Sequence, residues 1–139
     1  MIVNKTKIRV SYADTDQMGV MYYGRYFEYF ERGRTELLRE LGTPYAQMEE
    51  NGIKLPVVEA YCKYKKGIKY DELILIKTSI EEFSGTHIRM NYKIFDETEK
   101  NFFATGYTIH SFVSSEGKAV RPPKDFVQLV QRHIELSKK

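Results

Sequence analysis

Two carboxylates stand close together near the start of the chain, just before a glycine and a run of aromatic residues. Asp14 and Asp16 are separated by one residue, and Gly19 follows in the same short segment. A carboxylate can attack a carbonyl carbon or act as a general base on water. Where the segment enters a helix, the first amide N–H groups lack helical acceptors and can hold an oxyanion. The pattern therefore suits acyl transfer, although ordinary helix capping by Asp and Thr produces it too.

Other chemical signatures do not occur in the sequence. There is no Gly-x-Ser-x-Gly elbow, P-loop or Gly-x-Gly-x-x-Gly fingerprint. His87, His110 and His133 are too widely spaced to indicate a metal site, and we expect each to be a strand or helix-surface residue. Ser-His-Asp catalysis stays open, but nothing favours it. The lone Cys62 excludes an internal disulfide and a cysteine-rich zinc site, and we expect a small buried strand residue there.

Composition indicates one globular domain over residues 1–139. The net charge of +3 is too small to predict nucleic-acid binding, and charged residues at 29% are near the globular average. Apolar runs such as residues 73–76 are far shorter than the roughly 20 residues of a membrane helix. Charges in residues 1–9 replace the apolar stretch of a signal peptide. We therefore expect a cytoplasmic protein without a membrane span.

The periodicity of apolar residues predicts the elements on either side of the acidic segment. A strand is expected over residues 5–12, where apolar and polar residues alternate. Apolar residues then recur at helical spacing from Tyr23 to Leu41, which predicts one long helix. Gly42 and Pro44 favour the end of that helix.

A short second helix is expected from Pro44, capped by Thr43, to residues 51–52. The remaining elements are four strands and a final amphipathic helix, expected over residues 58–64, 72–83, 87–95, 102–113 and 123–136. Consecutive strands with hairpin-length connections form an antiparallel sheet. The chain is therefore predicted to be an α+β protein in which a five-stranded antiparallel sheet packs on one long helix.

Beyond its periodicity, the sequence resembles a known family. Residues 14–23, followed by Tyr26, Glu31 and Arg34, are similar to the signature of the 4-hydroxybenzoyl-CoA thioesterase family, particularly its YbgC-type acyl-CoA thioesterases. Further similar stretches are residues 55–60 and 104–107. The resemblance covers nearly the whole chain and implies the hot-dog fold, in which an antiparallel sheet wraps around a central helix. It also implies hydrolysis of an acyl-CoA thioester with neither a metal ion nor an organic cofactor.

The resemblance assigns roles to three residues of the acidic segment and the helix start. Asp16 matches the catalytic carboxylate, which either attacks the substrate or activates water. The backbone amide of Tyr23 matches the donor that polarises the thioester carbonyl. Gly19 is expected to let the backbone approach the substrate closely. Asp14 is expected to orient the segment.

Substrate contacts are less well defined by the sequence. Candidates for binding the substrate are Tyr22, Tyr26 and Phe27, which would line the acyl pocket, and Glu59, which would come from a partner subunit. Each also has a packing or strand role as an alternative. Glu31 and Arg34 are three residues apart on the helix and are expected to pair. The phosphates of coenzyme A need cations, for which the candidates are Lys63, Lys65, Lys66, Arg89, Lys118 and Arg121.

A unit of one helix and one sheet leaves a sheet edge open, so we expect a homodimer or homotetramer. The resemblance adds that the sites lie at subunit interfaces. Two alternatives stay open: hydrolysis of acyl groups on acyl carrier protein, and a non-catalytic module that binds acyl carriers. Acyl-chain length and the preference for aromatic or aliphatic groups also stay open.

Overall fold

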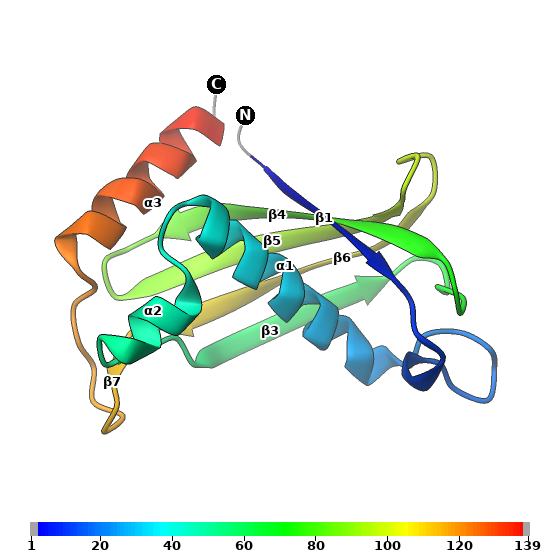
Figure 1. Ribbon diagram of the computed structural model, residues 1–139, viewed down its shortest axis with the longest axis horizontal. Helices are drawn as coiled ribbons and strands as arrows, with labels where there is room; N and C mark the ends of the chain where they lie inside the picture. The colour runs from blue at the N-terminus through cyan, green and yellow to red at the C-terminus, as the bar shows by residue number, and fades with distance from the viewer. Residues whose placement is uncertain (1–2, 138–139) are drawn as a thin grey trace.

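The computed structural model describes residues 3–137, which form one mixed α and β arrangement (Figure 1). Its long elements in chain order are β1 (Asn4–Arg9), α1 (Tyr26–Glu40), β3 (Val57–Tyr64), β4 (Leu73–Phe83), β5 (His87–Asp96), β6 (Phe102–Ser111) and α3 (Lys124–Ser137). The shorter ones are η1 (Tyr12–Asp14), η2 (Tyr23–Arg25), α2 (Tyr45–Glu50), β2 (Ile53–Lys54) and β7 (Val113–Ser114). The strands β1-β4-β5-β6-β3 form one antiparallel sheet in that order. This confirms the predicted α+β architecture with a long central helix.

The helix α1 lies along one face of the sheet, and its apolar side completes the core. Figure 1 shows the segment of residues 12–22 at one end of α1, with α2, β7 and the start of α3 at the other. At the centre, the Phe30 ring stacks on the Tyr92 ring of β5 with centroids 4.4 Å apart. Phe126 and Val130 of α3 belong to the same buried cluster. The three helices and the sheet therefore share one hydrophobic core.

Two glycines allow α1 and the sheet to approach closely. A Cβ atom on Gly106 of β6 would lie 2.3 Å from the Tyr61 carbonyl oxygen and 2.6 Å from the Phe30 ring. A Cβ atom on Gly33 of α1 would lie 2.5 Å from Oγ1 of Thr78. All three distances are below van der Waals contact, so a side chain at either position would force α1 away from the sheet.

The ends of the long helix follow the prediction with local differences. Its first turn is the 3₁₀ segment η2, and α1 ends at Glu40. Gly42 has a φ of +90°, and the Gly42 and Thr43 amides donate to the Arg39 and Leu38 carbonyls. This is the Schellman arrangement that glycine favours at a helix end.

Three sequence predictions about element ends are wrong. Thr43 does not cap α2, because its amide closes the preceding helix and Pro44 stands at the cap position without a side-chain bond. The first strand stops at Arg9 instead of residue 12, because its partner on β4 begins at Leu73. The strand predicted over residues 102–113 is β6, which stops at Ser111. The chain then enters β7, which pairs with β2 in a separate two-stranded sheet.

Two of the three histidines are buried, which corrects the expectation that they lie on element surfaces. His133 of α3 is 1% exposed, and its Nε2 accepts a hydrogen bond from the Ile80 amide at 3.3 Å. That amide lies beyond Thr78, the last β4 residue that pairs with β1. The histidine therefore joins α3 to a stretch of β4 that β1 no longer covers. His110 of β6 is 0% exposed.

Between residues 3 and 137, no helix combines the length and the apolar character that crossing a membrane requires.

We expect Gly106→Ala to lower the free energy of unfolding by about 1–3 kcal/mol, because the new methyl group overlaps the Tyr61 carbonyl and the Phe30 ring. Urea unfolding followed by circular dichroism measures the change. Gly24→Ala is the matched control, since its Cβ would meet only the exposed ring of Tyr22, which can rotate away. Equal stability of the Gly106 variant and the wild type would contradict the close approach of α1.

Acid is expected to weaken the contact of α3 with the sheet. Burial lowers the pKa of His133 below its ordinary value, and Glu40 opposes this more weakly. The neutral ring therefore adds stability above the unfolded pKa of about 6.5, and this stability is lost as the pH falls. His133→Gln keeps an acceptor for the Ile80 amide without a titrating group. Between about pH 7.5 and pH 5, the wild type should lose more unfolding free energy than this variant, and an equal loss would contradict the role.

Candidate active site

The acidic segment is held as a narrow loop by its own backbone. The Tyr22 amide donates to the Asp14 carbonyl, and the Asp16 amide donates to the Val20 carbonyl, each at 2.9 Å. The turn between them is closed by the Gly19 amide, which donates to the Asp16 carbonyl at 3.1 Å. The stretch carrying the acids is thus bridged to the stretch that leads into the helix.

Gly19 is required by the conformation of this turn. Its φ is +78°, a region in which residues with a Cβ are strained. Apart from its two chain neighbours, no residue between 3 and 137 has an atom within 4 Å of the position that a Cβ would occupy. A reason for glycine at this position is therefore the left-handed turn, and the open space beside it leaves room for a ligand.

Asp16 is half-buried and keeps part of its carboxylate free. Its Oδ1 accepts a hydrogen bond from the Met18 amide at 2.8 Å, which orients the side chain. Within residues 3–137, the other carboxylate oxygen has no hydrogen-bond or ion-pair partner. An oriented carboxylate with a free oxygen can attack a carbonyl or accept a proton from water.

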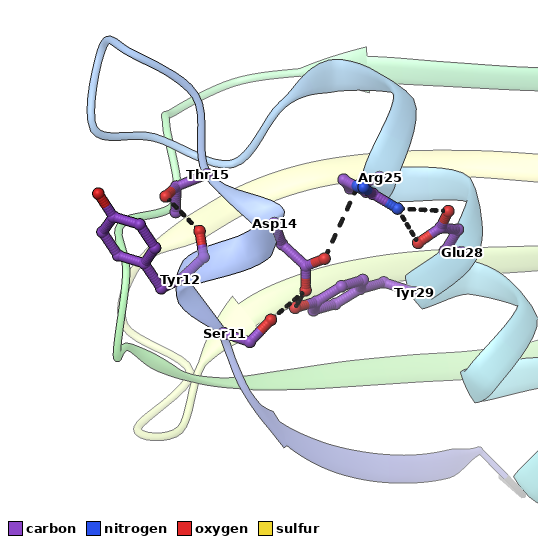
Figure 2. A network of polar contacts seen from close by, with 7 residues as sticks. All are labelled: Ser11, Tyr12, Asp14, Thr15, Arg25, Glu28 and Tyr29. Carbon is purple, nitrogen blue, oxygen red and sulfur yellow. Dashed lines mark hydrogen bonds and ion pairs between the residues drawn. The ribbon is translucent and has the colours of Figure 1, made fainter.

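Asp14 is instead fully engaged in anchoring the loop to the helix, as Figure 2 shows. Its Oδ2 accepts hydrogen bonds from the Tyr29 hydroxyl at 2.5 Å and from the Ser11 hydroxyl at 3.0 Å. Its Oδ1 lies 3.8 Å from Nε of Arg25, which also pairs with Glu28. Burial, together with the hydrogen bond to Asp14, raises the pKa of Tyr29. These contacts match the orienting role that the sequence predicted for Asp14.

The helix start beside the loop carries amide groups without acceptors. The Arg25 and Tyr26 amides donate to the Tyr22 and Tyr23 carbonyls. The Tyr23 and Gly24 amides come before Arg25, the first residue whose amide has a helical acceptor, and neither donates to another group within residues 3–137. Free N–H groups at the positive end of a helix are suited to holding an oxyanion.

A cluster of tyrosines supports this helix start. The Tyr64 ring at the end of β3 lies 4.7 Å from both the Tyr23 and the Tyr26 rings, measured between centroids. Its hydroxyl donates to the Tyr23 carbonyl at 3.3 Å. Tyr26 is buried, and burial raises its pKa to about 12. The backbone donors are therefore packed against the end of β3.

The candidates for the acyl contact occupy different environments. Tyr22 is exposed beside the free amides, whereas Tyr26 lies in the core. Phe27 is half-buried and packs edge-on against the Phe30 ring at 5.8 Å. Glu59 lies on the sheet face opposite α1, where its carboxylate accepts a hydrogen bond from the Tyr107 hydroxyl. Tyr22 therefore lies beside the free amides, whereas Glu59 faces away from α1.

The lysines and arginines considered for binding the phosphates of coenzyme A are also dispersed over the structure. Lys65 and Lys66 follow β3 directly after Tyr64, at the same end as the free amides, and their own amides donate to the Phe103 carbonyl. Arg89 lies on the opposite sheet face with its guanidinium 4.0 Å from the Tyr107 ring centroid, and Lys63 follows Tyr61 on that face. The last two, Lys118 and Arg121, lie between β7 and α3 at the other end of α1 (Figure 1).

Sequence reasoning did not find a cavity beside the middle of α1. Its volume is about 260 Å³, and its walls come from α1, α2 and residues 55–57. Arg34 lines it and donates to the Tyr92 hydroxyl at 3.2 Å. The predicted ion pair of Glu31 with Arg34 is absent from the described residues, because the guanidinium turns toward Tyr92 instead. Tyr92 is 58 positions from Arg34, so no local pattern indicates this contact.

Comparisons with known proteins support the resemblance seen in the sequence. A putative acyl-CoA thioesterase YneP from Bacillus subtilis is 41% identical over 96 residues, which is 69% of this chain and 70% of the relative. An acyl-CoA thioesterase YbgC from Haemophilus influenzae is 36% identical over 92 residues, or 66% and 68% of the two chains. The crystal structure of a DHNA-CoA thioesterase from Staphylococcus aureus matches with a TM-score of 0.94 at 34% identity, over 99% of this chain and 95% of that one.

The family model described as the thioesterase-like superfamily matches residues 10–130, which include the acidic loop, α1 and the whole of β3 to β6. The similar solved structures share the hot-dog architecture seen in Figure 1. The chain belongs to the thioesterase-like superfamily.

Proposed function

We propose that this protein hydrolyses acyl-CoA thioesters to a carboxylic acid and free coenzyme A. The observation that carries the proposal is one rigid loop-and-helix unit that holds both an oriented, partly free carboxylate and two free amides. These are Asp16 and the Tyr23 and Gly24 N–H groups. A carboxylate and an oxyanion site are the two groups that acyl transfer requires.

In the proposed reaction, the Tyr23 amide donates to the thioester carbonyl and stabilises the negative oxygen as the carbonyl is attacked. Asp16 either attacks the carbonyl carbon to form an anhydride, which water then hydrolyses, or takes a proton from the attacking water. Either route breaks the C–S bond and releases the thiol of coenzyme A. The proposal needs no metal ion or organic cofactor, because the chain supplies the base or nucleophile and the oxyanion donors.

The names of the relatives support this choice of substrate. YneP and YbgC are named as acyl-CoA thioesterases, and the structural relative from Staphylococcus aureus is named for DHNA-CoA. A panel of straight-chain and aromatic acyl-CoA esters that includes DHNA-CoA would define the acyl group. The same acyl groups on acyl carrier protein would test the second candidate carrier.

We further propose that two copies pair through β3. Among the described residues, this strand bonds only to β6, which leaves its other edge open. Almost all of its residues are exposed, including Val57, Val58 and Tyr61. A long, exposed apolar edge is a template for strand pairing, and a two-fold axis would align the two strands antiparallel. A dimer of such dimers would give the homotetramer.

Such a dimer would bring the cavity of one copy to the free amides of the other. The end of β3 contacts the start of α1 through Tyr64 and Tyr23, whereas Val57 at its beginning lines the cavity with Arg34. Antiparallel pairing about the strand centre places the start of one β3 beside the end of the other. Each active site would then combine the Asp16 loop of one copy with the cavity of its partner.

We expect Asp16→Asn to lower kcat for acyl-CoA hydrolysis by about 100-fold or more, because an amide can neither attack the carbonyl nor accept the proton. Asn keeps the oxygen that accepts from the Met18 amide, so the loop should stay folded. Thiol release measured with a chromogenic reagent gives the rate, and circular dichroism checks the fold. A folded variant with wild-type turnover on every ester would overturn the assignment of Asp16.

Pairing through β3 predicts a particle of at least twice the chain mass of 16.4 kDa. Sedimentation velocity at micromolar concentration measures this mass directly. A monomer that hydrolyses acyl-CoA at the rate of the concentrated sample would overturn the shared site.

A further inference from the structure

A chain of buried polar groups crosses the core from α1 to the segment before β3. Nη1 of Arg34 donates to the Tyr92 hydroxyl at 3.2 Å. That hydroxyl lies 2.6 Å from Oγ1 of Thr108, which lies 2.8 Å from Nε2 of His110. Nδ1 of the same ring lies 2.9 Å from the Leu55 carbonyl oxygen. We call these four side chains, Arg34, Tyr92, Thr108 and His110, the polar relay.

With a neutral His110 ring, the hydrogen bonds of the relay run in one direction. Arginine has no acceptor, so the Tyr92 oxygen accepts from it, and because the single Thr108 hydroxyl proton goes to His110, the Tyr92 hydroxyl donates to Thr108. The Leu55 carbonyl has no proton, so Nδ1 of His110 carries one and Nε2 accepts from Thr108. This requires a neutral ring, and burial lowers the pKa of His110 to about 4. Every bond of the relay is therefore satisfied near neutral pH.

Arg34 at one end of the relay, and residue 55, to which His110 bonds at the other end, both belong to the lining of the cavity beside α1. Thr108 and His110 lie behind this lining at 2% and 0% exposure. The Leu55 amide also donates to the Tyr45 hydroxyl at 3.2 Å. Both polar groups of residue 55 are thus bonded to side chains from other elements. Satisfied buried networks of this kind hold one arrangement of the groups around them.

We propose that Tyr92, Thr108 and His110 are positioning residues that fix the distance between Arg34 and residues 55–57, and thereby determine which acyl groups are hydrolysed efficiently. This proposal rests on the proposed function, since it takes the cavity as the acyl site. A short acyl group would not reach the cavity, so its KM would not depend on the relay. A longer acyl group contacts both Arg34 and residues 55–57, so its KM depends on their separation.

The test compares Thr108→Val with Thr108→Ser across an acyl-CoA panel from acetyl to dodecanoyl, with benzoyl included. Valine keeps the shape of threonine but leaves Tyr92 and His110 without their shared partner, whereas serine keeps the hydroxyl. For the longest acyl-CoA that the wild type hydrolyses efficiently, we expect valine to raise KM by about tenfold and to change kcat little. The KM and kcat of the shortest substrate should stay close to their wild-type values. Serine should restore the wild-type chain-length profile. Thermal unfolding of each variant is recorded in parallel.

A selective loss for long acyl groups that serine rescues supports the positioning role. An unchanged chain-length profile in the valine variant, or an equal loss for short and long substrates, overturns it. Should the valine variant not fold, Tyr92→Phe removes the same link and keeps the ring stacked on Phe30, and the same two outcomes apply. A wild-type protein that hydrolyses none of the panel overturns the proposed function, and this inference with it. An active wild type with unchanged variants overturns only the positioning role.

Discussion

The close contact between α1 and the sheet is the constraint on which the rest of the structure depends. Gly33 and Gly106 leave no room for a Cβ atom, and the Phe30 ring lies flat on the Tyr92 ring. With the helix axis held this near to the sheet, its start is fixed beside Tyr64 at the end of β3. Its middle is fixed near Tyr92, within reach of Arg34. One packing contact therefore positions both the free amides and the cavity wall.

Asp14 and Asp16 are residues of the same type whose surroundings give them different contacts. Asp14 has both carboxylate oxygens in contact with groups from the chain before the loop and from the helix, including Ser11, Arg25 and Tyr29. Asp16 has one oxygen bonded to its own turn and the other free. A carboxylate that is fully bonded holds structure, whereas one with a free oxygen is available to a substrate. The first aspartate thus ties the loop to the helix, and the second keeps one oxygen free on that loop.

Buried polar groups contribute to this rigidity at two further places. His133 binds α3 to β4 through a single backbone amide, and His110 ends a relay that reaches α1. An unpaired polar group in the core is costly, so each of these rings is useful only with its partners in place. The sequence predicted both histidines at the surface of their elements. In an alternating strand or an amphipathic helix, the neighbouring residues do not indicate which distant group a histidine bonds. Their backbone partners, the Ile80 amide and the Leu55 carbonyl, lie 53 and 55 positions away.

The sequence by itself determined the elements and the family. Alternation predicted β4 and β5 to within one residue at each end, helical spacing predicted α1, and Gly42 marked its end. The motif around Asp16 indicated a thioesterase. The tertiary structure alone decided that Arg34 turns from Glu31 to Tyr92, and that Asp14 is tied to Tyr29. The reason is physical: periodicity and turn chemistry act between near neighbours along the chain, whereas these contacts join residues that only the packing of α1 on the sheet brings together.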